Sequence, residues 1–304
     1  MNSGILLVDK PQGITSHDVV ARTRRLAGTR RVGHAGTLDP MATGLLVLGV
    51  DGSTRLLTYL VGLDKEYLAT IRLGVGSSTD DAEGELFDAA SADLVAAVDE
   101  AHVADGIAKL TGVIEQVPSA VSAIKVDGKR AYQRVRDGEQ VELKARTVTI
   151  SAFEVLEVRR VDGFVDLDVR VECSSGTYIR ALARDLGADL GVGGHLTALR
   201  RTRIGRFEVA AASVLEDLDV ASALIGAADA AELALPVVHV TGQQAIDLGH
   251  GKRIDAAGAP ETAKGAPIAA VADTAVGGRR LVAIVERRGE TLKVVVGFPP
   301  EDAS

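Results

Sequence analysis

The chain has 304 residues and a mass of 31.6 kDa, with 34 basic and 42 acidic side chains and a formal charge of −8. Its single cysteine excludes an internal disulfide and any metal site built from several cysteines. No apolar run reaches the roughly 20 residues that cross a bilayer, and the N-terminal stretch lacks the long apolar core of a signal peptide. We therefore expect one or two domains, a cytoplasmic location and no membrane partner.

The charges are segregated along the chain despite the negative total. Basic residues gather in segments 21–34, 125–146 and 195–206, whereas acidic residues gather in segments 77–105 and 213–233. A polyanion responds to the local field and not to the net charge, so this pattern is compatible with nucleic-acid binding. Solvated helix faces would produce the same pattern, and charge alone does not separate the two interpretations.

Hydrophobic periodicity predicts both strands and helices in the first half of the chain. In chain order we first expect a buried strand at Ile5–Asp9 and a turn at Lys10–Gly13. A helix should follow from an N-cap at Ser16 to about Leu26, with Val19, Val20 and Leu26 facing inward. After a loop-rich segment over 28–44 we expect strands at Leu45–Val50 and Tyr67–Leu73, and then a helix from an N-cap at Ser91 to about Leu110. Several arginines lie on the first helix and in the loop that follows it.

The second half of the chain begins with a segment that fits neither period. Segment 116–146 is polar and basic and contains two glycines, so we expect a long surface excursion. Beyond it we expect paired strands at Thr147–Val158 and Phe164–Cys173, joined at Asp162-Gly163, and then a helix at Gly176–Leu190. We expect a domain boundary at the alanine-rich segment 221–235, before Pro236. The residues that follow should form a small β domain with strands at Leu281–Arg287 and Thr291–Gly297.

The most unusual segment is the glycine-rich run from Arg31 to Gly44, which places Asp39 directly before Pro40 between two apolar strands. Glycines let the backbone approach a ligand closely, and the proline fixes the chain next to the carboxylate. Such an Asp would be presented, ionised, to a bound ligand. An ordinary Asp-Pro turn without a catalytic role would have the same sequence, and the residues alone favour that simpler interpretation.

Other side chains also admit a functional and a structural interpretation. Arg180 falls in the first turn of a predicted helix, where its charge opposes the helix dipole, so we expect a carboxylate partner. Tyr67 begins a strand and either packs in the core or offers its phenol to a ligand. His34 either contacts a ligand or caps its loop. Cys173 is expected to be a small buried hydrophobe.

Several mechanisms are excluded by missing motifs. The chain has no Gly-x-x-x-x-Gly-Lys-Ser/Thr phosphate loop, no Gly-x-Ser-x-Gly elbow and no His-x-Glu followed by Cys-x-x-Cys. Its six histidines include no close pair typical of transition-metal sites. We therefore expect chemistry that uses carboxylate, guanidinium and phenol groups without a cofactor or a metal.

Five ordered motifs together resemble the TruB family of tRNA pseudouridine synthases. They are GILLVDKPQG at 4–13, GHAGTLDPMATG at 33–44, KEY at 65–67, GTYIR at 176–180 and LRR at 199–201, and PSAVSAIKVDGKRAYQRVRDG at 118–138 is similar to the family's RNA-gripping insertion. The resemblance implies a mixed α/β fold with a largely antiparallel sheet and flanking helices over residues 1–230. The tail at 236–299 resembles, more loosely, a PUA-like RNA-binding β domain.

The resemblance also implies roles for individual residues. Asp39 is the catalytic carboxylate that attacks the target nucleoside, Arg180 pairs with it, and Tyr67 stacks on the flipped base. Leu199 walls the uracil pocket, and His34 fills the gap left by the extruded base. The residues assigned to substrate binding are His34, Leu199, Tyr178, Lys10, Pro11, Lys125, Lys129, Arg130 and Arg31.

The implied substrate is uridine 55 in the T-arm of tRNA, and the implied form is a monomer of the bacterial stand-alone type with no obligatory protein partner. A tRNA-folding chaperone and a synthase acting on another RNA are the alternatives. A structural scaffold has no support beyond the acidic segment at 77–105. An intact set of Asp39, Tyr67 and Arg180 disfavours a pure binding protein, since binding alone needs no such set.

Overall fold

The computed structural model describes residues 3–119, 125–126, 129–130, 144–274 and 277–299. Its contacts divide the chain into two compact units. The first consists of residues 1–40, 44–63 and 203–304, and the second of residues 41–43 and 64–202. Each unit brings together segments that are distant in the sequence, and each contains some of the predicted site residues.

The first unit is built around strand β1 (Gly4–Lys10), which is buried along almost its whole length. β1 pairs antiparallel with β3 (Thr43–Val50), and short strands complete this part of the sheet: β2 (Val32–His34) on β3, and β14 (Ser213–Val214) and β15 (Ile225–Gly226) on β1. Leu6 and Val8 face a core under helix α1, whereas Ile5 and Leu7 face a second core. Burial on both faces explains the unbroken apolar run that predicted this strand.

Helix α1 (Ser16–Leu26) confirms the predicted helix but corrects two of its details. Thr15, not Ser16, is the N-cap, and it forms a capping box with Asp18. Leu26 is 50% exposed, so its predicted inward orientation was wrong. The buried residues of the helix, Ser16, Val19, Val20 and Thr23, define a stripe that passes beside Leu26.

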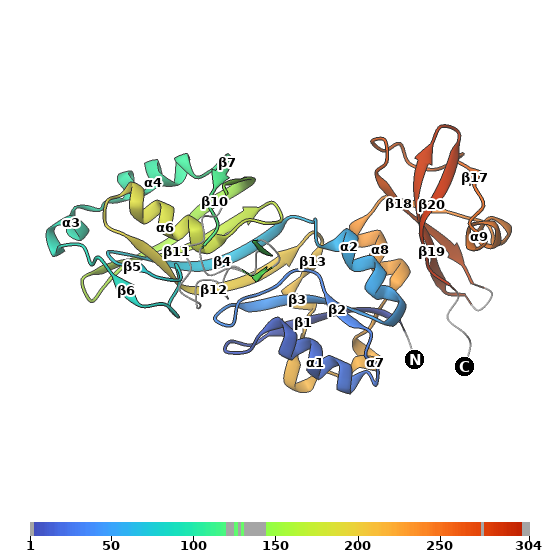
Figure 1. Cartoon of the computed structure of the whole chain (residues 1–304), viewed down its shortest axis with the longest axis horizontal. Helices are drawn as coiled ribbons and strands as arrows, with labels where there is room; N and C mark the ends of the chain where they lie inside the picture. Colours follow the sequence, from blue (N-terminus) through green and yellow to red (C-terminus); the bar gives the residue numbers. More distant parts are fainter. Residues whose placement is uncertain (1–2, 120–124, 127–128, 131–143, 275–276, 300–304) are drawn as a thin grey trace. The chain divides into compact units, whose positions relative to one another are not determined.

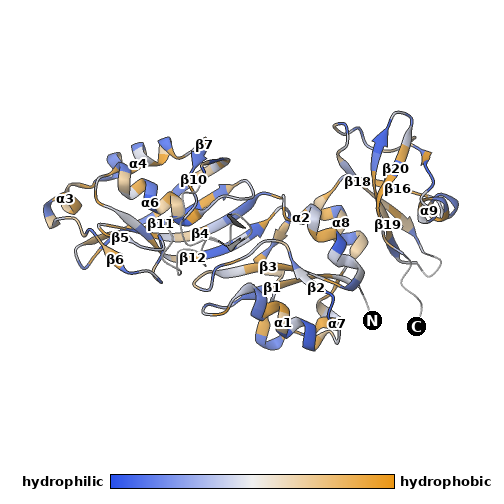
Figure 2. Ribbon diagram, viewed as in Figure 1, coloured by the Kyte–Doolittle hydropathy of each residue, from blue (hydrophilic) through white to orange (hydrophobic). Residues whose placement is uncertain are grey.

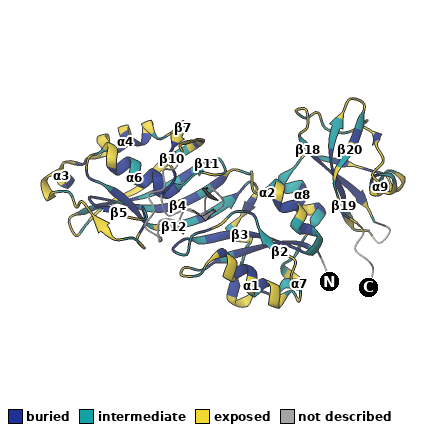
Figure 3. Cartoon of the chain, viewed as in Figure 1, coloured by how far each residue is buried: buried dark blue, intermediate teal, exposed yellow. Residues whose placement is uncertain are grey.

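Short helices connect the strands of the first unit. Three are 3₁₀ helices, at Asp51–Leu56, Val209–Ala211 and Leu215–Asp217. The others are the α-helices α2 (Leu57–Leu60), α7 (Val220–Ala223) and α8 (Ala227–Ala234). One further short strand, β13 (Phe207–Glu208), pairs with the end of β12. The buried alanines of α8 belong to the same hydrophobic cluster as β1 and the C-terminal sheet. Hydrophobic residues run along these strands, while the outer face of α1 is exposed (Figures 2 and 3).

The C-terminal residues form a five-stranded sheet in the order β16-β18-β19-β20-β17, with one helix. Its elements are β16 (Val237–His239), α9 (Gly242–Gly249), β17 (Ile254–Asp255), β18 (Pro267–Asp273), β19 (Arg279–Arg288) and β20 (Thr291–Gly297). The predicted strands correspond to β19 and β20. β18 was not predicted because its alanine-rich sequence has weak strand propensity. The expected small β domain is therefore confirmed.

The second unit is a largely antiparallel sheet in the order β12-β4-β11-β10-β7. These strands are β12 (Gly194–Ile204), β4 (Lys65–Leu73), β11 (Phe164–Cys173), β10 (Arg146–Val161) and β7 (Gly112–Gln116). The turn between β10 and β11 is Asp162-Gly163, both in the left-handed region as a tight hairpin requires. The mixed α/β class and its antiparallel character are confirmed.

Helices of the second unit lie together on one side of this sheet (Figure 1). They are α3 (Ala92–Ala97), α4 (Glu100–Lys109) and α6 (Ile179–Asp189). Two short strand pairs complete the unit: β5 (Gly76–Ser77) with β6 (Leu86–Phe87), and β8 (Lys125–Val126) with β9 (Lys129–Arg130). A side chain at Gly187 would collide with the backbone of Gly193, so α6 needs glycine where it passes the loop that leads into β12.

Two predicted helix boundaries in this unit were wrong, and so was one predicted loop of the first unit. The helix from Ser91 breaks at Val98, because Asp99 caps a new helix by accepting from the His102 N–H. The helix from Gly176 begins only at Ile179, since Gly176 has a φ of 91°. The predicted loop over 28–44 contains β2. Within the excursion predicted at 116–146, segments 120–124, 127–128 and 131–143 lie outside the described residues.

Candidate active site

The loop that carries Asp39 is fastened on both sides of this carboxylate. The Ser16 hydroxyl donates to the Leu38 carbonyl at 3.0 Å and accepts from the Leu38 N–H at 2.8 Å. On the other side, the Pro40 carbonyl accepts from the Gly13 N–H at 2.8 Å. Asp39 itself is half-buried. Its backbone is therefore held from the turn before α1 and from the first residue of that helix.

Lys10 adds a buried cation to the same loop. Its side chain is fully buried, and its Nζ donates to the carbonyls of Pro11 at 2.9 Å, Ile14 at 2.8 Å and Pro40 at 3.3 Å. An ammonium group has three protons, and these three carbonyl oxygens offer an acceptor for each of them. Lys10, which the resemblance assigned to substrate binding, thus braces the loop that presents Asp39.

His34, Pro11 and Arg31 surround this loop in the first unit. His34 lies at the end of β2, half-buried, and its ring packs edge-to-face against that of His17, with 5.7 Å between the centroids. Pro11 is half-buried in the turn after β1, whereas Arg31 is exposed just before β2. Asp39, Lys10 and the histidine pair therefore belong to the same unit, and the Arg31 side chain is exposed.

Tyr67 and Leu199 belong to the second unit. Tyr67 lies on β4 and Leu199 on β12, which neighbour each other in the sheet, and each is buried to more than nine-tenths. On β4 the buried residues alternate with more exposed ones, so Tyr67 shares a face with Lys65 and Ala69. The Tyr67 side chain is therefore largely buried on one face of the sheet, and its role toward a ligand stays a prediction.

Arg180 forms a buried ion pair with Asp81, a residue that the sequence analysis did not single out. Its Nη1 lies 3.1 Å from Asp81 Oδ2, with side chains 6% and 2% exposed, and also donates to the Thr79 carbonyl at 2.9 Å. The expected carboxylate partner of Arg180 is thus present. The Thr79 hydroxyl also binds the other Asp81 oxygen, at 2.5 Å, so the carboxylate orientation is fixed.

The second arginine of α6 repeats this arrangement one turn later. Arg184 Nη1 lies 3.2 Å from Asp80 Oδ2, and its Nη2 donates to the Val117 carbonyl at 2.8 Å and pairs with Asp185. Burial raises the pKa of Asp185, although Arg184 acts in the opposite direction. Neighbouring arginines at i and i+4 therefore hold consecutive aspartates of the turn at 79–81.

Tyr178 lies directly before α6, half-buried, with both polar groups of its backbone bound to one side chain. Its N–H donates to Gln116 Oε1 at 2.8 Å, and its carbonyl accepts from Gln116 Nε2 at 3.0 Å. Gln116 is 2% exposed at the end of β7. The backbone that leads into Arg180 is thus fixed by a residue distant in the sequence.

A buried pair of cations lies on the inner side of the second unit. Lys65 is 6% exposed on β4, opposite Cys173, and Arg201 is 1% exposed on β12. Burial and then the charge of Arg201 lower the pKa of Lys65 to about 8. Cys173 is buried, as predicted. Lys65 shares a face of β4 with Tyr67, and the sequence analysis named it only as part of a motif.

The remaining predicted residues lie in the β8–β9 pair. Lys125 pairs with Arg130 and Val126 with Lys129 across this two-stranded ribbon. Their side chains are outside what the structure describes, so the RNA-gripping role assigned to them stays a prediction.

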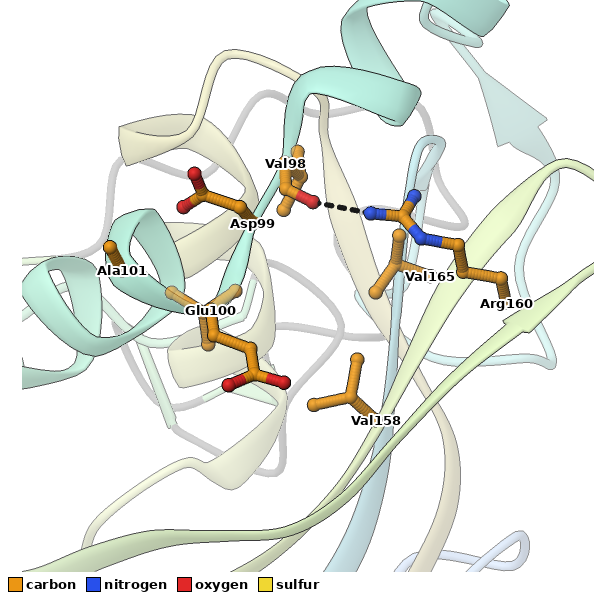
Figure 4. A pocket seen from close by; sticks show the side chains of 8 residues that line it. Val98, Asp99, Glu100, Ala101, Val158, Arg160 and Val165 are labelled. Carbon is orange, nitrogen blue, oxygen red and sulfur yellow. Dashed lines mark hydrogen bonds between the residues drawn. The ribbon is translucent and has the colours of Figure 1, made fainter.

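The second unit also contains an open pocket of about 650 Å³ that is separate from the predicted residues (Figure 4). It lies between the start of α4 and the β10–β11 hairpin, where the Arg160 guanidinium donates to the Val98 carbonyl at 2.7 Å. This bond places a cation at the C-terminal end of α3, where it interacts favourably with the helix dipole. None of the residues assigned to catalysis or substrate binding lines this pocket.

Among the residues that the structure describes, no three His, Cys, Asp or Glu side chains are arranged to hold a metal ion. No described helix combines the length and apolar character needed to span a membrane.

Comparison with known proteins decides the family. Residues 24–179 match the TruB family pseudouridylate synthase N-terminal domain, and residues 180–238 match the tRNA pseudouridylate synthase B C-terminal domain. The chain belongs to the TruB family. It is therefore a pseudouridine synthase, an isomerase, and the resemblance inferred from its five motifs is confirmed.

Full-length relatives agree with this assignment. The chain is 60% identical to tRNA pseudouridine synthase B of Leifsonia xyli subsp. xyli, over 99% of this chain and 98% of the relative. It is 55% identical to tRNA pseudouridine synthase B of Thermobifida fusca, over 98% of this chain and 99% of the relative. The TruB family assignment thus extends over the C-terminal β domain.

Solved structures share the fold at lower identity. A chain from a Cbf5-Nop10-Gar1 complex is 27% identical with a TM-score of 0.74, covering 98% of this chain and 86% of that chain. A chain from an H/ACA RNP bound to a substrate RNA containing 2'-deoxyuridine is 26% identical with a TM-score of 0.73, at the same coverage. The fold of this chain, including its C-terminal β domain, is therefore shared with these two chains.

Proposed function

We propose that this TruB family member converts uridine 55 in the T-loop of tRNA to pseudouridine. The proposal depends on where two of the family motifs lie in the structure. One lies on a loop whose backbone is hydrogen-bonded on both sides of Asp39, and the other places Arg180 in a buried ion pair. The relatives that match over almost their whole length are named tRNA pseudouridine synthase B, which supports tRNA as the substrate. We further propose that the protein acts in the cytoplasm as a monomer without an obligatory protein partner.

The reaction is an isomerisation. The N1–C1′ bond breaks, the uracil ring rotates, and a C5–C1′ bond forms; the C5 hydrogen leaves as a proton and N1 gains one. Nothing is oxidised or reduced overall and no group is lost except that exchanged proton, so the balance requires no co-reactant. A carboxylate serves this chemistry by adding to C6, by attacking C1′, or by assisting elimination to a glycal.

We propose that Asp39 supplies this carboxylate. The buried Lys10 and the Ser16 hydroxyl hold the loop backbone, so the carboxylate would meet the nucleoside without a reorganisation cost. Arg180 would pair with Asp39 as the resemblance implies. Its observed bonds to Asp81 and Thr79 restrict the guanidinium to one orientation, which is what a charge partner in a reacting site needs.

Access to the target base requires that the nucleotide leave its stack. Flipping costs a few kcal/mol, and stacking on an aromatic ring returns about 1–3 kcal/mol per base. We propose that Tyr67 provides this ring, that Leu199 lines the uracil pocket, and that His34 occupies the space left in the RNA. Tyr178, Pro11 and the basic residues at 125–130 would complete the binding surface.

We propose that residues 236–299 form an RNA-binding domain alongside a catalytic domain at 1–230. Deleting these residues is a poor test, because Ala269, Val271 and Phe298 share a hydrophobic cluster with α8 and β1. Replacement of the exposed Arg253 by alanine is better suited, since it leaves that cluster intact. A contribution of the domain predicts weaker tRNA binding by this variant, and unchanged binding would argue against contact at that position.

The test of the proposed function is product mapping. Wild-type protein is incubated with an unmodified tRNA transcript, a minimal T-arm hairpin, and an unrelated hairpin that contains uridines. Pseudouridine at position 55 of the tRNA and at the matching position of the T-arm, but not in the unrelated hairpin, is expected. Equal modification of the unrelated hairpin would exclude T-arm specificity, and tRNA refolding without any pseudouridine would favour a chaperone.

A further inference from the structure

Helix α6, which carries Arg180, begins without a side-chain cap of its own. Two other helices have capping boxes, in which the residue at the third helical position accepts from the N-cap N–H: Asp18 for Thr15 in α1, and Gln244 for Thr241 in α9. The N-cap of α6 is Tyr178, and its third helical residue is Ala181, which has no acceptor. The N-cap N–H of α6 must therefore be satisfied from elsewhere.

Gln116 supplies the missing acceptor from another strand. Its Oε1 accepts from the Tyr178 N–H at 2.8 Å, the same bond that a capping box would make, although it lies 62 residues away in sequence. Its Nε2 donates to the Tyr178 carbonyl at 3.0 Å, which also begins the helical hydrogen bonds to Ala181 and Leu182. One buried amide therefore binds both polar groups of the residue at which the chain turns into the helix.

The consequence falls on Arg180, two residues further along. The backbone of Tyr178 sets the direction in which the first turn of α6 leaves, and Arg180 lies in that turn with its guanidinium on Asp81. The residue after β7 makes a second bond in this region, where its carbonyl, that of Val117, accepts from Arg184 Nη2 at 2.8 Å. Residues 116 and 117 thus bind the chain on both sides of Arg180 in the sequence.

We infer that Gln116 is a positioning residue for the pseudouridine synthase reaction, acting on Arg180 through the backbone of Tyr178. This inference rests on the proposed function of Arg180. Replacement of Gln116 removes the acceptor that binds the Tyr178 N–H and one of the donors to the Tyr178 carbonyl, and it permits the helix start to shift. A displacement of the order of 1 Å at a reacting group is enough to lower a catalytic rate by up to about 100-fold.

The first experiment compares three variants on a tRNA transcript. Gln116→Met retains length but forms no hydrogen bond, Gln116→Glu retains the acceptor for the Tyr178 N–H, and Glu115→Gln alters the adjacent exposed side chain as a matched control. We expect kcat to fall about 10-fold for Gln116→Met with KM within about twofold of wild type, a smaller loss for Gln116→Glu, and no change for Glu115→Gln. An unchanged kcat in Gln116→Met, or a loss confined to KM, would overturn the inference.

A double-mutant cycle separates action through Arg180 from a general structural effect. Gln116→Met is combined with Arg180→Lys, and single-turnover rates are measured with enzyme in excess. If Gln116 acts through Arg180, it adds little further loss once the guanidinium is gone. Full additivity of the two losses would show that Gln116 acts independently of Arg180, and the inference would be wrong.

Hydrogen exchange provides a readout that does not depend on activity. The Tyr178 amide should exchange slowly in the wild type and at least about 10-fold faster in Gln116→Met, while amides in the middle of β11 remain unchanged. Unchanged protection at Tyr178 would refute the capping role even in an inactive protein. Absence of pseudouridine formation by the wild type, with the exchange result as expected, would instead refute the proposed function alone.

Discussion

Arg180 and Asp81 form an ion pair at 3.1 Å with almost no exposure of either side chain. Two opposite charges removed from water are stable only when each has its partner, so this pair is sensitive to loss of either member. The pair also joins two motifs that are distant in sequence. It anchors the arginine of the family's fourth motif to the acidic segment whose purpose the sequence left open.

Asp81→Asn should therefore damage both stability and activity. Breaking a buried pair by removing one partner costs about 3–5 kcal/mol, and loss of an oriented guanidinium costs about 10²-fold in kcat. Denaturant unfolding and single-turnover rates measure the two effects. Asp93→Asn, at an exposed position of the same acidic segment, is the matched control and should change neither. Wild-type kcat in Asp81→Asn would show that this partner does not orient Arg180.

Lys10→Met tests the bracing of the Asp39 loop. The substitution retains the apolar stem but removes the ammonium that binds the Pro40 carbonyl and two others. We expect a loss of about 2–4 kcal/mol in the free energy of unfolding, because three partly buried carbonyls lose the hydrogen bond from the ammonium group, together with a lower kcat. Thermal unfolding and turnover of a tRNA transcript check this. Normal turnover with reduced stability would restrict Lys10 to a structural role.

The shifted pKa of Lys65 predicts how stability depends on pH. Its pKa is about 8 in the folded chain and ordinarily 10.5, so the unfolded chain holds the extra proton between these values. Stability contributed by this group therefore rises as the pH increases from about 8 to 10.5. Lys65→Met should flatten that part of the profile measured by urea unfolding. An identical slope in the variant would show that Lys65 does not cause it.

Arg31 tests the electrostatic part of RNA binding. It is exposed in the basic segment before β2, and its replacement by alanine should reduce the slope of log K against log salt by about 0.7–0.9 for each lost phosphate contact. Arg159→Ala is the matched control, because Arg159 already pairs with Asp168 and Glu157. Filter binding of tRNA over a range of salt concentrations measures both slopes. Equal slopes for the two variants would show that Arg31 does not contact the RNA.

Local pattern was sufficient to predict much of the fold. Alternation identified the strand ending at Leu73 and the β10–β11 hairpin, and an unbroken apolar run identified β1, because these features depend on neighbouring residues only. The predicted helix boundaries were wrong where a side chain formed a hydrogen bond that the local pattern does not show. Ser16, for instance, binds the backbone of Leu38 instead of capping its own helix.

The partners within the site were beyond prediction for the same reason. A carboxylate near Arg180 was expected, but nothing local identifies Asp81 among the nine acids of segment 77–105. Gln116 was treated only as the start of an excursion, although its side chain caps a helix 62 residues later. A missing acceptor at Ala181 was the one available signal, and it shows that a cap is needed without showing which residue provides it.

The central claim, that the Asp39 carboxylate performs the isomerisation, is tested most directly by tritium release. A tRNA transcript carries tritium at C5 of its uridines, and formation of the C5–C1′ bond liberates that label into water. Wild-type protein should release one equivalent per tRNA, and Asp39→Asn, with unchanged thermal stability, should be slower by at least about 10³-fold. Release by Asp39→Asn at the wild-type rate would contradict the account.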